Sequence, residues 1–248
     1  MLNTVRLKIR RQDNPKSPSY WDEFEIPYKP QMNVISCLLA IQRNPVNARG
    51  EKVAPVVWEC NCLEEVCGAC TMVINSGVRQ ACSALVDQLD QPITLEPMTK
   101  FPVVRDLQVD RSKMFETLKD IHAWVEIDGS HNMGPGQRQD PYKSLKAYQF
   151  SRCMTCGCCC EACPQFNAHS PFMGAFAFGQ THLFNSHPTG KFDAPTRLDT
   201  IMGMGGLTDC GNAQNCARAC PKNIPLTDAI AELGWTTTKR AVGKLFKE

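Results

Sequence analysis

The stretch RCMTCGCCCEACP, at residues 152–164, indicates how the second half of the chain is built. Its cysteines follow the pattern Cys-x2-Cys-x2-Cys-x3-Cys-Pro, which begins at Cys153 and ends at Pro164. This run is typical of bacterial ferredoxins, in which the fourth cysteine binds a different iron–sulfur cluster from the first three. A second cysteine run is therefore needed to complete the sites.

The stretch DCGNAQNCARACP, at residues 209–221, repeats the pattern with one cysteine missing. When the two runs are aligned, Ala213 stands at the position of Cys156. The cysteines that align are Cys153 with Cys210, Cys159 with Cys216, and Cys163 with Cys220. The second copy therefore carries a methyl group where the first copy carries a thiol.

Two ligand sets follow if the last cysteine of each run crosses to the other cluster. The complete set is predicted to bind a [4Fe–4S] cluster and comprises Cys153, Cys156, Cys159 and Cys220. The incomplete set is predicted to bind a [3Fe–4S] cluster, because a cluster corner without its thiolate tends to lose its iron. It comprises Cys163, Cys210 and Cys216. The alternative is a [4Fe–4S] cluster with water, Asn212 or Gln214 at the open corner.

The first half of the chain has a cysteine pattern of a different type. The segment CLEEVCGAC, residues 62–70, is followed by a hairpin that ends near Cys82. The order Cys-x4-Cys-x2-Cys with a distant fourth cysteine is the plant-type spacing for a [2Fe–2S] cluster. The predicted ligands are Cys62, Cys67, Cys70 and Cys82. Gly68 removes a Cβ from the loop and so allows the backbone to approach the cluster closely.

Four further cysteines fall outside these patterns, and we expect none of them to be a primary ligand. Cys37 lies among apolar helix positions, and Cys158 and Cys160 would break the ferredoxin spacing. A buried thiol is the preferred interpretation of each. Cys60, two residues before a predicted ligand, is interpreted as a buried or neighbouring thiol, with a substitute-ligand role as the alternative.

The pattern of apolar residues divides the chain into two domains. Residues 4–12 and 22–28 predict a β-hairpin, residues 33–44 a helix capped by Asn33, and residues 70–82 a second hairpin. A helix is predicted over residues 111–125 and a turn-rich loop over residues 129–141. From Tyr142 onwards the pattern is helical, with predicted helices over residues 170–184, 194–206 and 225–246. We predict an α+β protein. A β-grasp plant-type ferredoxin domain over residues 1–107 is followed by an all-α bacterial-ferredoxin-like domain over residues 108–248.

Composition favours iron–sulfur ligation over the other uses of cysteine. The chain has 15 cysteines, an odd number, and its first residues lack the apolar core of a secretory signal, so a disulfide scaffold is disfavoured. Structural zinc would use the Cys-x2-Cys pairs but does not explain the repeated run. A net charge of +2 predicts no nucleic-acid partner. No apolar stretch is long enough to span a bilayer, so we expect membrane association through a partner only.

The order and spacing of these motifs resemble the iron–sulfur subunits of succinate dehydrogenase and fumarate reductase over nearly the whole chain. The segments that carry the resemblance are CLEEVCGACTMVIN, FPVVRDLQVDR, CMTCGCCCEACP and CGNAQNCARACPKNIPLT. They are most similar to the form found in Gram-positive bacteria that use menaquinone. The resemblance implies electron transfer from a flavoprotein subunit with FAD, through [2Fe–2S], [4Fe–4S] and [3Fe–4S], to quinone, with no substrate site on this chain.

The resemblance also implies partners and a location. The expected partners are the flavoprotein subunit, a membrane-anchor cytochrome b subunit with haem b, and a quinone, menaquinone, near the anchor. The expected location is the cytoplasmic face of the cell membrane. Asn167, Ala168 and Gly211 replace the tryptophans and histidine of ubiquinone-reducing relatives, so their quinone pocket does not carry over.

Two alternative functions remain at this stage. A fumarate reductase subunit would have the same architecture with electrons flowing in the reverse direction. Relatives of glycolate oxidase or heterodisulfide reductase usually carry two [4Fe–4S] runs without a plant-type domain, so Cys62 to Cys82 argue against them.

Overall fold

The computed structural model describes residues 3–126, 134 and 138–246 of the chain. The chain divides into two compact units, and the division is not a single cut along the sequence. The first unit comprises Met1–Arg111 together with Met154–Glu161, and the second comprises Ser112–Cys153 and Ala162–Glu248. The segment that carries Cys156 and Cys159 is therefore counted with the first unit.

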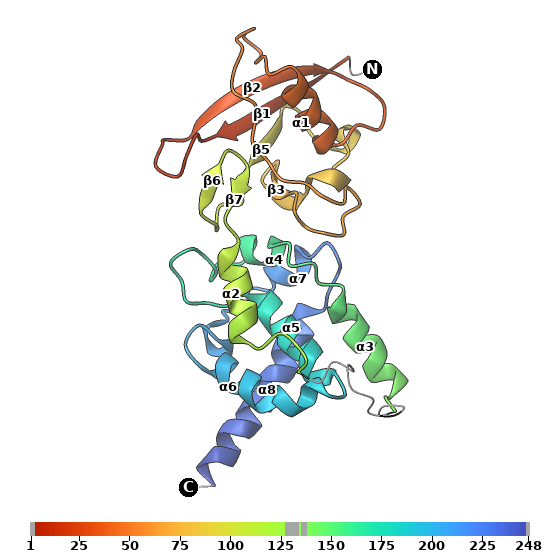
Figure 1. Ribbon diagram of the computed structural model, residues 1–248, viewed down its shortest axis with the longest axis vertical. Coiled ribbons are helices and arrows are strands. Elements are labelled where there is room, and N and C mark those ends of the chain that lie inside the picture. Colours follow the sequence, from red (N-terminus) through yellow and green to blue (C-terminus); the bar gives the residue numbers. More distant parts are fainter. Residues whose placement is uncertain (1–2, 127–133, 135–137, 247–248) are drawn as a thin grey trace. The chain divides into compact units, whose positions relative to one another are not determined.

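The first unit is built on a mixed five-stranded sheet with the strand order β2-β1-β5-β3-β4 (Figure 1). Its strands are β1 (Thr4–Arg11), β2 (Tyr20–Pro27), β3 (Thr71–Ile74), β4 (Gly77–Gln80) and β5 (Ile93–Glu96). Strands β1 and β2 form the predicted antiparallel hairpin, and β1 pairs in parallel with β5. The alternating burial along β1 shows why the period-two pattern of its sequence was informative.

Helix α1 (Val34–Arg43) contributes an apolar face to the core of this unit. The side chain of Asn33 caps the helix, because its Oδ1 accepts a hydrogen bond from the Ser36 amide at 2.9 Å. Val34, Leu38 and Ile41 are buried in the core. Each such side chain stabilises the fold by about 1.5–3 kcal/mol.

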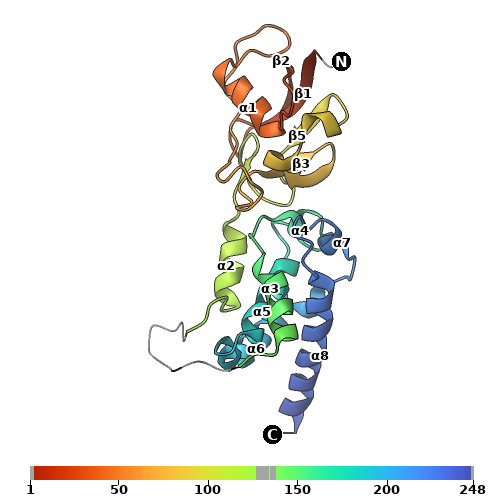
Figure 2. The same cartoon turned by 90° about the vertical axis from the view of Figure 1, so that its right-hand side faces the viewer.

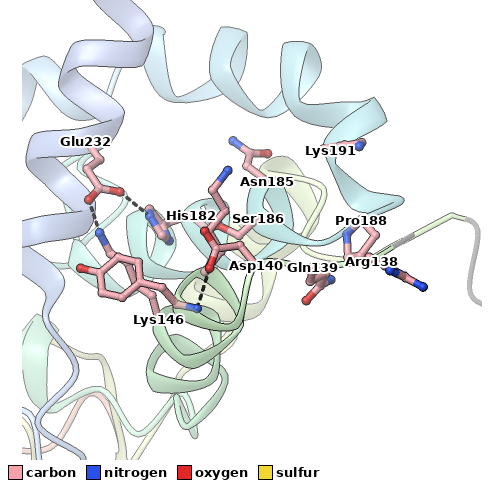
Figure 3. Close-up of a pocket in the computed structure, with 12 residues that line it drawn as sticks. Arg138, Gln139, Asp140, Lys146, His182, Asn185, Ser186, Pro188, Lys191 and Glu232 are labelled. Carbon is pink, nitrogen blue, oxygen red and sulfur yellow. Dashed lines mark hydrogen bonds and ion pairs between the residues drawn. The ribbon is translucent and has the colours of Figure 1, made fainter. Parts of the chain in front are cut away.

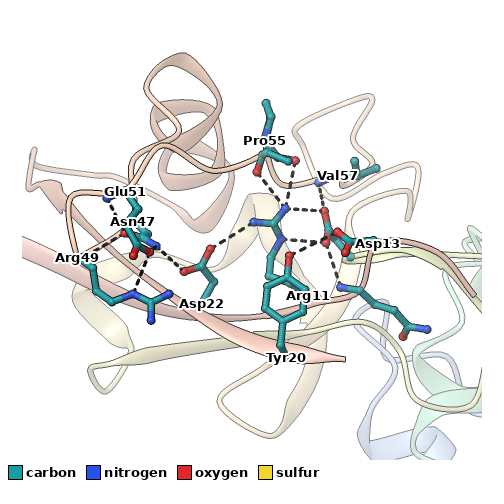
Figure 4. A network of polar contacts seen from close by, with 12 residues as sticks. Arg11, Asp13, Tyr20, Asp22, Asn47, Arg49, Glu51, Pro55 and Val57 are labelled. Atoms are coloured by element: carbon teal, nitrogen blue, oxygen red, sulfur yellow. Dashed lines mark hydrogen bonds and ion pairs between the residues drawn. The ribbon is translucent and has the colours of Figure 1, made fainter. Parts of the chain in front are cut away.

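A buried charge network connects β1 to the segment that precedes the first cysteine loop (Figure 4). Arg11 has no exposed surface and donates to Asp106 from Nε at 2.9 Å and from Nη2 at 3.2 Å. Asp106 also accepts the Val57 amide at 2.9 Å, and Arg11 donates to the Ala54 carbonyl at 3.0 Å. Asp22 lies 3.5 Å from Nη1 of Arg11. Residues 54–57 are thus held to the sheet immediately before the cysteines.

The remaining elements of the first unit are short. They are η1 (Ala81–Ser83), η2 (Val86–Gln88), β6 (Val103–Arg105), β7 (Gln108–Val109) and α4 (Cys158–Glu161). Glu161 fixes the end of α4, because its carboxylate accepts the Thr99 hydroxyl at 2.6 Å and the Lys100 amide at 3.0 Å. These contacts join residues far apart in the sequence.

The second unit contains helices and no strand among its described residues. Its elements are α2 (Ser112–Asp120), α3 (Pro141–Ser151), α5 (Ala175–Ser186), η3 (Gly190–Asp193), α6 (Ala194–Met202), η4 (Leu207–Asp209), α7 (Asn215–Arg218) and α8 (Leu226–Leu245). Helix α5 contacts α3, α6 and α8, as both cartoon views show (Figure 2). A mixed sheet followed by a helical unit confirms the predicted α+β class.

Two helix boundaries differ from the sequence prediction. The pattern from Ser170 predicts a helix, but α5 begins only at Ala175, after Gly174 with a φ of 89°. Helix α2 ends at Asp120, whereas the pattern continues to Val125. The turn-rich segment expected after it, residues 129–141, lies mostly outside the described residues.

Candidate metal centres

The loop that begins at Cys62 is shaped to hold a thiolate. The sulfur of Cys62 accepts three backbone N–H groups, from Glu64 at 3.4 Å, Val66 at 3.3 Å and Cys67 at 3.3 Å. Leu63 and Glu65 have φ values of 62° and 55°, which turn the amides towards the sulfur. The amides of Glu64 and Val66 lower the pKa of the Cys62 thiol to about 7. A sulfur that accepts three amides suits a metal-bound thiolate.

The other three predicted [2Fe–2S] ligands lie close to Cys62. Cys67 accepts the Ala69 amide at 3.4 Å, and Cys62 and Cys67 interact directly. Cys82 interacts with Cys70 and Cys62, and burial together with Cys70 raises the pKa of its thiol to about 11. Asn33, the cap of α1, donates to the Cys82 carbonyl at 2.9 Å. The sheet hairpin and α1 thus bring the fourth cysteine to the loop.

Cys60 lies in the same group but differs from the expectation of a buried thiol. It interacts electrostatically with Cys62, Cys67 and Cys82. Its residue surface is exposed, whereas Cys37 is fully buried and burial raises its pKa to about 12. The burial expected for Cys37 is confirmed. Cys60 is a neighbouring thiol, one of the two roles expected for it, and it is not buried.

Gly68 brings the first cysteine loop against the segment 154–161. A Cβ at this position would lie 2.6 Å from Cβ and 2.8 Å from Cα of Cys156. Its φ of 72° is also in the region that favours glycine. Gly68 is therefore needed for the contact between the two loops as well as for the turn.

Cys158 is a buried neighbour of the predicted ligands, as its spacing indicated. It has no exposed surface, and its sulfur accepts Nε2 of Gln80 at 3.3 Å. The hydrogen bond between Cys158 and Cys156 lowers the pKa of Cys156, and the same contact, with burial, raises the pKa of Cys158. Cys158 thus acts as a protonated donor to Cys156. Cys160 is also fully buried.

The predicted [4Fe–4S] ligands are divided between the two compact units. Cys156 and Cys159 belong to the first unit, and Cys153 and Cys220 to the second. The sulfur of Cys220 accepts the Ile224 amide at 3.5 Å, a contact of the kind seen at Cys62. This ligand set therefore stays a prediction.

A cavity in the second unit is lined by all three cysteines of the incomplete set. Ala213 lines the same cavity, together with Phe172 and other residues between Cys163 and Ile230. Asn212 and Gln214 have φ values of 50° and 60°, so the chain around Ala213 is tightly turned. Asn215 also lines the cavity, and its Nδ2 donates to the Ala162 carbonyl at 3.0 Å, which joins the two cysteine runs. Ala213 and the three cysteines of the predicted set thus line one cavity.

A second cavity of this unit is polar and includes no cysteine (Figure 3). The carboxylate of Glu232 on α8 accepts a hydrogen bond from Nζ of Lys146 on α3. Its Oε2 lies 2.7 Å from Nε2 of His182 on α5. His182 also packs against the Phe150 ring at a centroid distance of 4.5 Å. No local sequence pattern indicates this group, because each of its three members lies on a different helix. Nothing in its chemistry resembles an iron–sulfur site.

Cluster ligation does not require the thiols to converge on one ion, because they are distributed over the irons of the cluster. Among the residues that the structure describes, no group of three or more His, Cys, Asp or Glu side chains is arranged to hold a single metal ion. The thiol donors, the amides that surround Cys62 and the cavity beside Ala213 instead fit iron–sulfur clusters. These features define an iron–sulfur protein with a ferredoxin-type sheet domain.

Comparison with known proteins identifies the family. Residues 6–116 match a 2Fe-2S iron-sulfur cluster binding domain. The chain is 56% identical over 243 residues, 98% of its length and 96% of the relative's, to the succinate dehydrogenase iron-sulfur subunit of Bacillus subtilis (strain 168). It is 33% identical to a fumarate reductase iron-sulfur subunit of Mycobacterium tuberculosis (strain CDC 1551 / Oshkosh) over 99% of this chain and 97% of the relative.

A solved structure shows the same fold. A chain from the Mycobacterium smegmatis Sdh1 complex in the apo form superposes with a TM-score of 0.81 at 20% identity, covering 97% of this chain and 98% of that one. The protein belongs to the family of succinate dehydrogenase iron–sulfur subunits, which confirms the resemblance seen in the sequence. It is an electron-transfer subunit of succinate dehydrogenase.

Proposed function

We propose that this chain transfers electrons through three clusters, each held by one of the cysteine sets described above. The observation that carries the proposal is the cavity that Cys163, Cys210, Cys216 and Ala213 line together. Bound clusters of this kind accept and release single electrons, with potentials set by type, hydrogen bonds and exposure. The cysteine thiolates hold them, and the surrounding amides and charges adjust them.

Cys62, Cys67, Cys70 and Cys82 hold the [2Fe–2S] cluster of the first unit. The three amides that donate to Cys62 stabilise its thiolate form. This assignment is supported by the family match over residues 6–116.

Cys153, Cys156, Cys159 and Cys220 hold the [4Fe–4S] cluster. The hydrogen bond from Cys158 favours the thiolate form of Cys156, the form that binds iron. Cys163, Cys210 and Cys216 hold the [3Fe–4S] cluster, with the methyl group of Ala213 at the vacant corner. The domain boundary that we propose from the sequence, residues 1–107 and 108–248, places the last two clusters on the helical domain.

We assign the identities of the partner subunits from the family. We assign a flavoprotein subunit with FAD as the electron donor and a cytochrome b anchor with haem b and menaquinone as the acceptor side, at the cytoplasmic face of the membrane. None of the helices in the described ranges is long and apolar enough to cross a membrane. The runner-up is a fumarate reductase subunit, favoured by the 33% identity to the mycobacterial relative.

The experiment that tests the cluster assignment is the substitution Ala213→Cys in the assembled complex. A thiol at the vacant corner is expected to convert [3Fe–4S] to [4Fe–4S], which removes the EPR signal that the oxidised three-iron cluster gives. Ala213→Val is the matched control, since it adds bulk without a ligand and should keep that signal. If Ala213→Cys keeps the oxidised signal unchanged, residue 213 does not face the cluster and the assignment is wrong.

A further inference from the structure

Arg111, the last residue of the continuous part of the first unit, holds the turn between two predicted [2Fe–2S] ligands. Its Nη1 donates to the Gly68 carbonyl at 2.9 Å, and its Nη2 donates to the Ala69 carbonyl at 3.2 Å. Gly68 and Ala69 are the two residues between Cys67 and Cys70. The planar guanidinium is suited to such a double contact.

The same side chain acts on the second cysteine loop. Gly68, which Arg111 binds, packs directly against Cα and Cβ of Cys156. The guanidinium charge is also near enough to interact electrostatically with Cys156. Its side chain is only 15% exposed, so water screens the charge incompletely. One guanidinium therefore donates hydrogen bonds to the first cysteine loop and interacts electrostatically with Cys156 in the second.

Glu59 opposes this charge. Its Oε2 lies 2.9 Å from Nη2 of Arg111, and its side chain is 36% exposed. Gln108 donates to the other carboxylate oxygen at 3.1 Å. The pair thus places a more buried positive group and a more exposed negative group beside the same turn.

We propose that Arg111 is a positioning residue that raises the reduction potentials of the [2Fe–2S] and [4Fe–4S] clusters and is opposed in this by Glu59. The inference rests on the cluster assignments of the proposed function. A cluster gains negative charge when it accepts an electron, so a fixed positive charge favours the reduced form and a negative charge disfavours it. Arg111 thereby adjusts two successive centres together.

The test is an EPR-monitored redox titration of the assembled complex carrying Arg111→Gln, Arg111→Lys or Glu59→Gln. Arg111→Gln is expected to make reduction of each cluster about threefold less favourable, a downward shift of about 28 mV at 59 mV per tenfold change. Glu59→Gln is expected to shift both potentials upward. Arg111→Lys keeps the charge, so its potentials should stay nearer to wild type than those of Arg111→Gln.

The opposite signs separate charge from structure, because loosening the turn would not reverse direction between the two substitutions. Arg49→Gln is the control, since Arg49 is an exposed residue of the same unit paired with Glu51, and it should shift neither potential. Shifts of the same sign for Arg111→Gln and Glu59→Gln, or no shift, overturn the inference. If Arg111→Gln prevents assembly, Glu59→Gln decides alone, and an unchanged or lowered potential overturns it. Absence of the two cluster signals from the wild type would instead refute the proposed function.

Discussion

Substituting Gly68 by Ala tests how closely the two cysteine loops must approach. The new Cβ would lie 2.6 Å and 2.8 Å from Cβ and Cα of Cys156, and a backbone atom cannot move away as a flexible side chain can. Gly50 provides a matched control, because its φ of 78° is similar to the 72° of Gly68 but nothing lies within 4 Å of its Cβ position. The two substitutions share the backbone strain and differ in the clash.

The magnitude follows from these two terms. A non-glycine residue in the left-handed region costs about 1–2 kcal/mol, which applies to both variants. Overpacking adds about 1–3 kcal/mol for Gly68→Ala alone. At about 2–4 °C per kcal/mol, the complex with Gly68→Ala should lose its cluster absorbance about 2–12 °C below the complex with Gly50→Ala.

The assay is thermal loss of visible cluster absorbance, with EPR spin counts of each cluster at low temperature. We expect fewer [4Fe–4S] spins per complex in Gly68→Ala, because the clash displaces Cys156, a predicted ligand of that cluster. Equal melting temperatures and equal spin counts for the two variants would refute the reasoning.

Three further predictions concern groups away from the glycines. Asp106→Asn removes the charge of one of the two carboxylates beside buried Arg11, which keeps Asp22 at 3.5 Å, and should cost about 1.5–3 kcal/mol. Denaturant unfolding of the complex measures this; a loss below about 1 kcal/mol would show that the network is not critical. Cys158→Ser should leave all three cluster signals in EPR, since Cys158 is a buried neighbour; loss of the [4Fe–4S] signal would identify it as a ligand. The hydrogen bond from Arg240 holds the pKa of Asp199 well below its usual range. The ionised Asp199 therefore stabilises the folded state fully above the unfolded pKa of about 3.9. This stabilisation is lost only as the pH falls towards the lowered pKa of the folded state. The melting difference between Asp199→Asn and wild type should therefore be equal at pH 5 and pH 8, and a difference that changes between them contradicts this.

The features that the sequence predicted correctly depend on neighbouring residues. The hairpin of β1 and β2 follows from alternation within one short stretch, and α1 starts where Asn33 can cap it. Helix α8, Leu226–Leu245, agrees to within a residue at each end with the helix predicted over residues 225–246. In each case the determining pattern can be read within one continuous stretch of the chain.

The features that the sequence could not predict depend on contacts between distant segments. Cys60 is exposed, and the segment that precedes it, residues 54–57, is held to the sheet by Arg11 and Asp106 from distant positions in the sequence. The contact between Gln80 and Cys158 joins residues 78 positions apart. Neither feature has a local sequence pattern, because the residues in contact lie far apart in the chain.

The discontinuous first unit has a consequence for synthesis of the chain. Residues 154–161 complete that unit, yet they leave the ribosome only after residues 112–153 have been made. At about 5–20 residues per second, this leaves an interval on the order of seconds in which the nascent sheet domain lacks its last segment. During that interval Gly68 and Gln80 lack the contacts that they make with Cys156 and Cys158 in the finished chain.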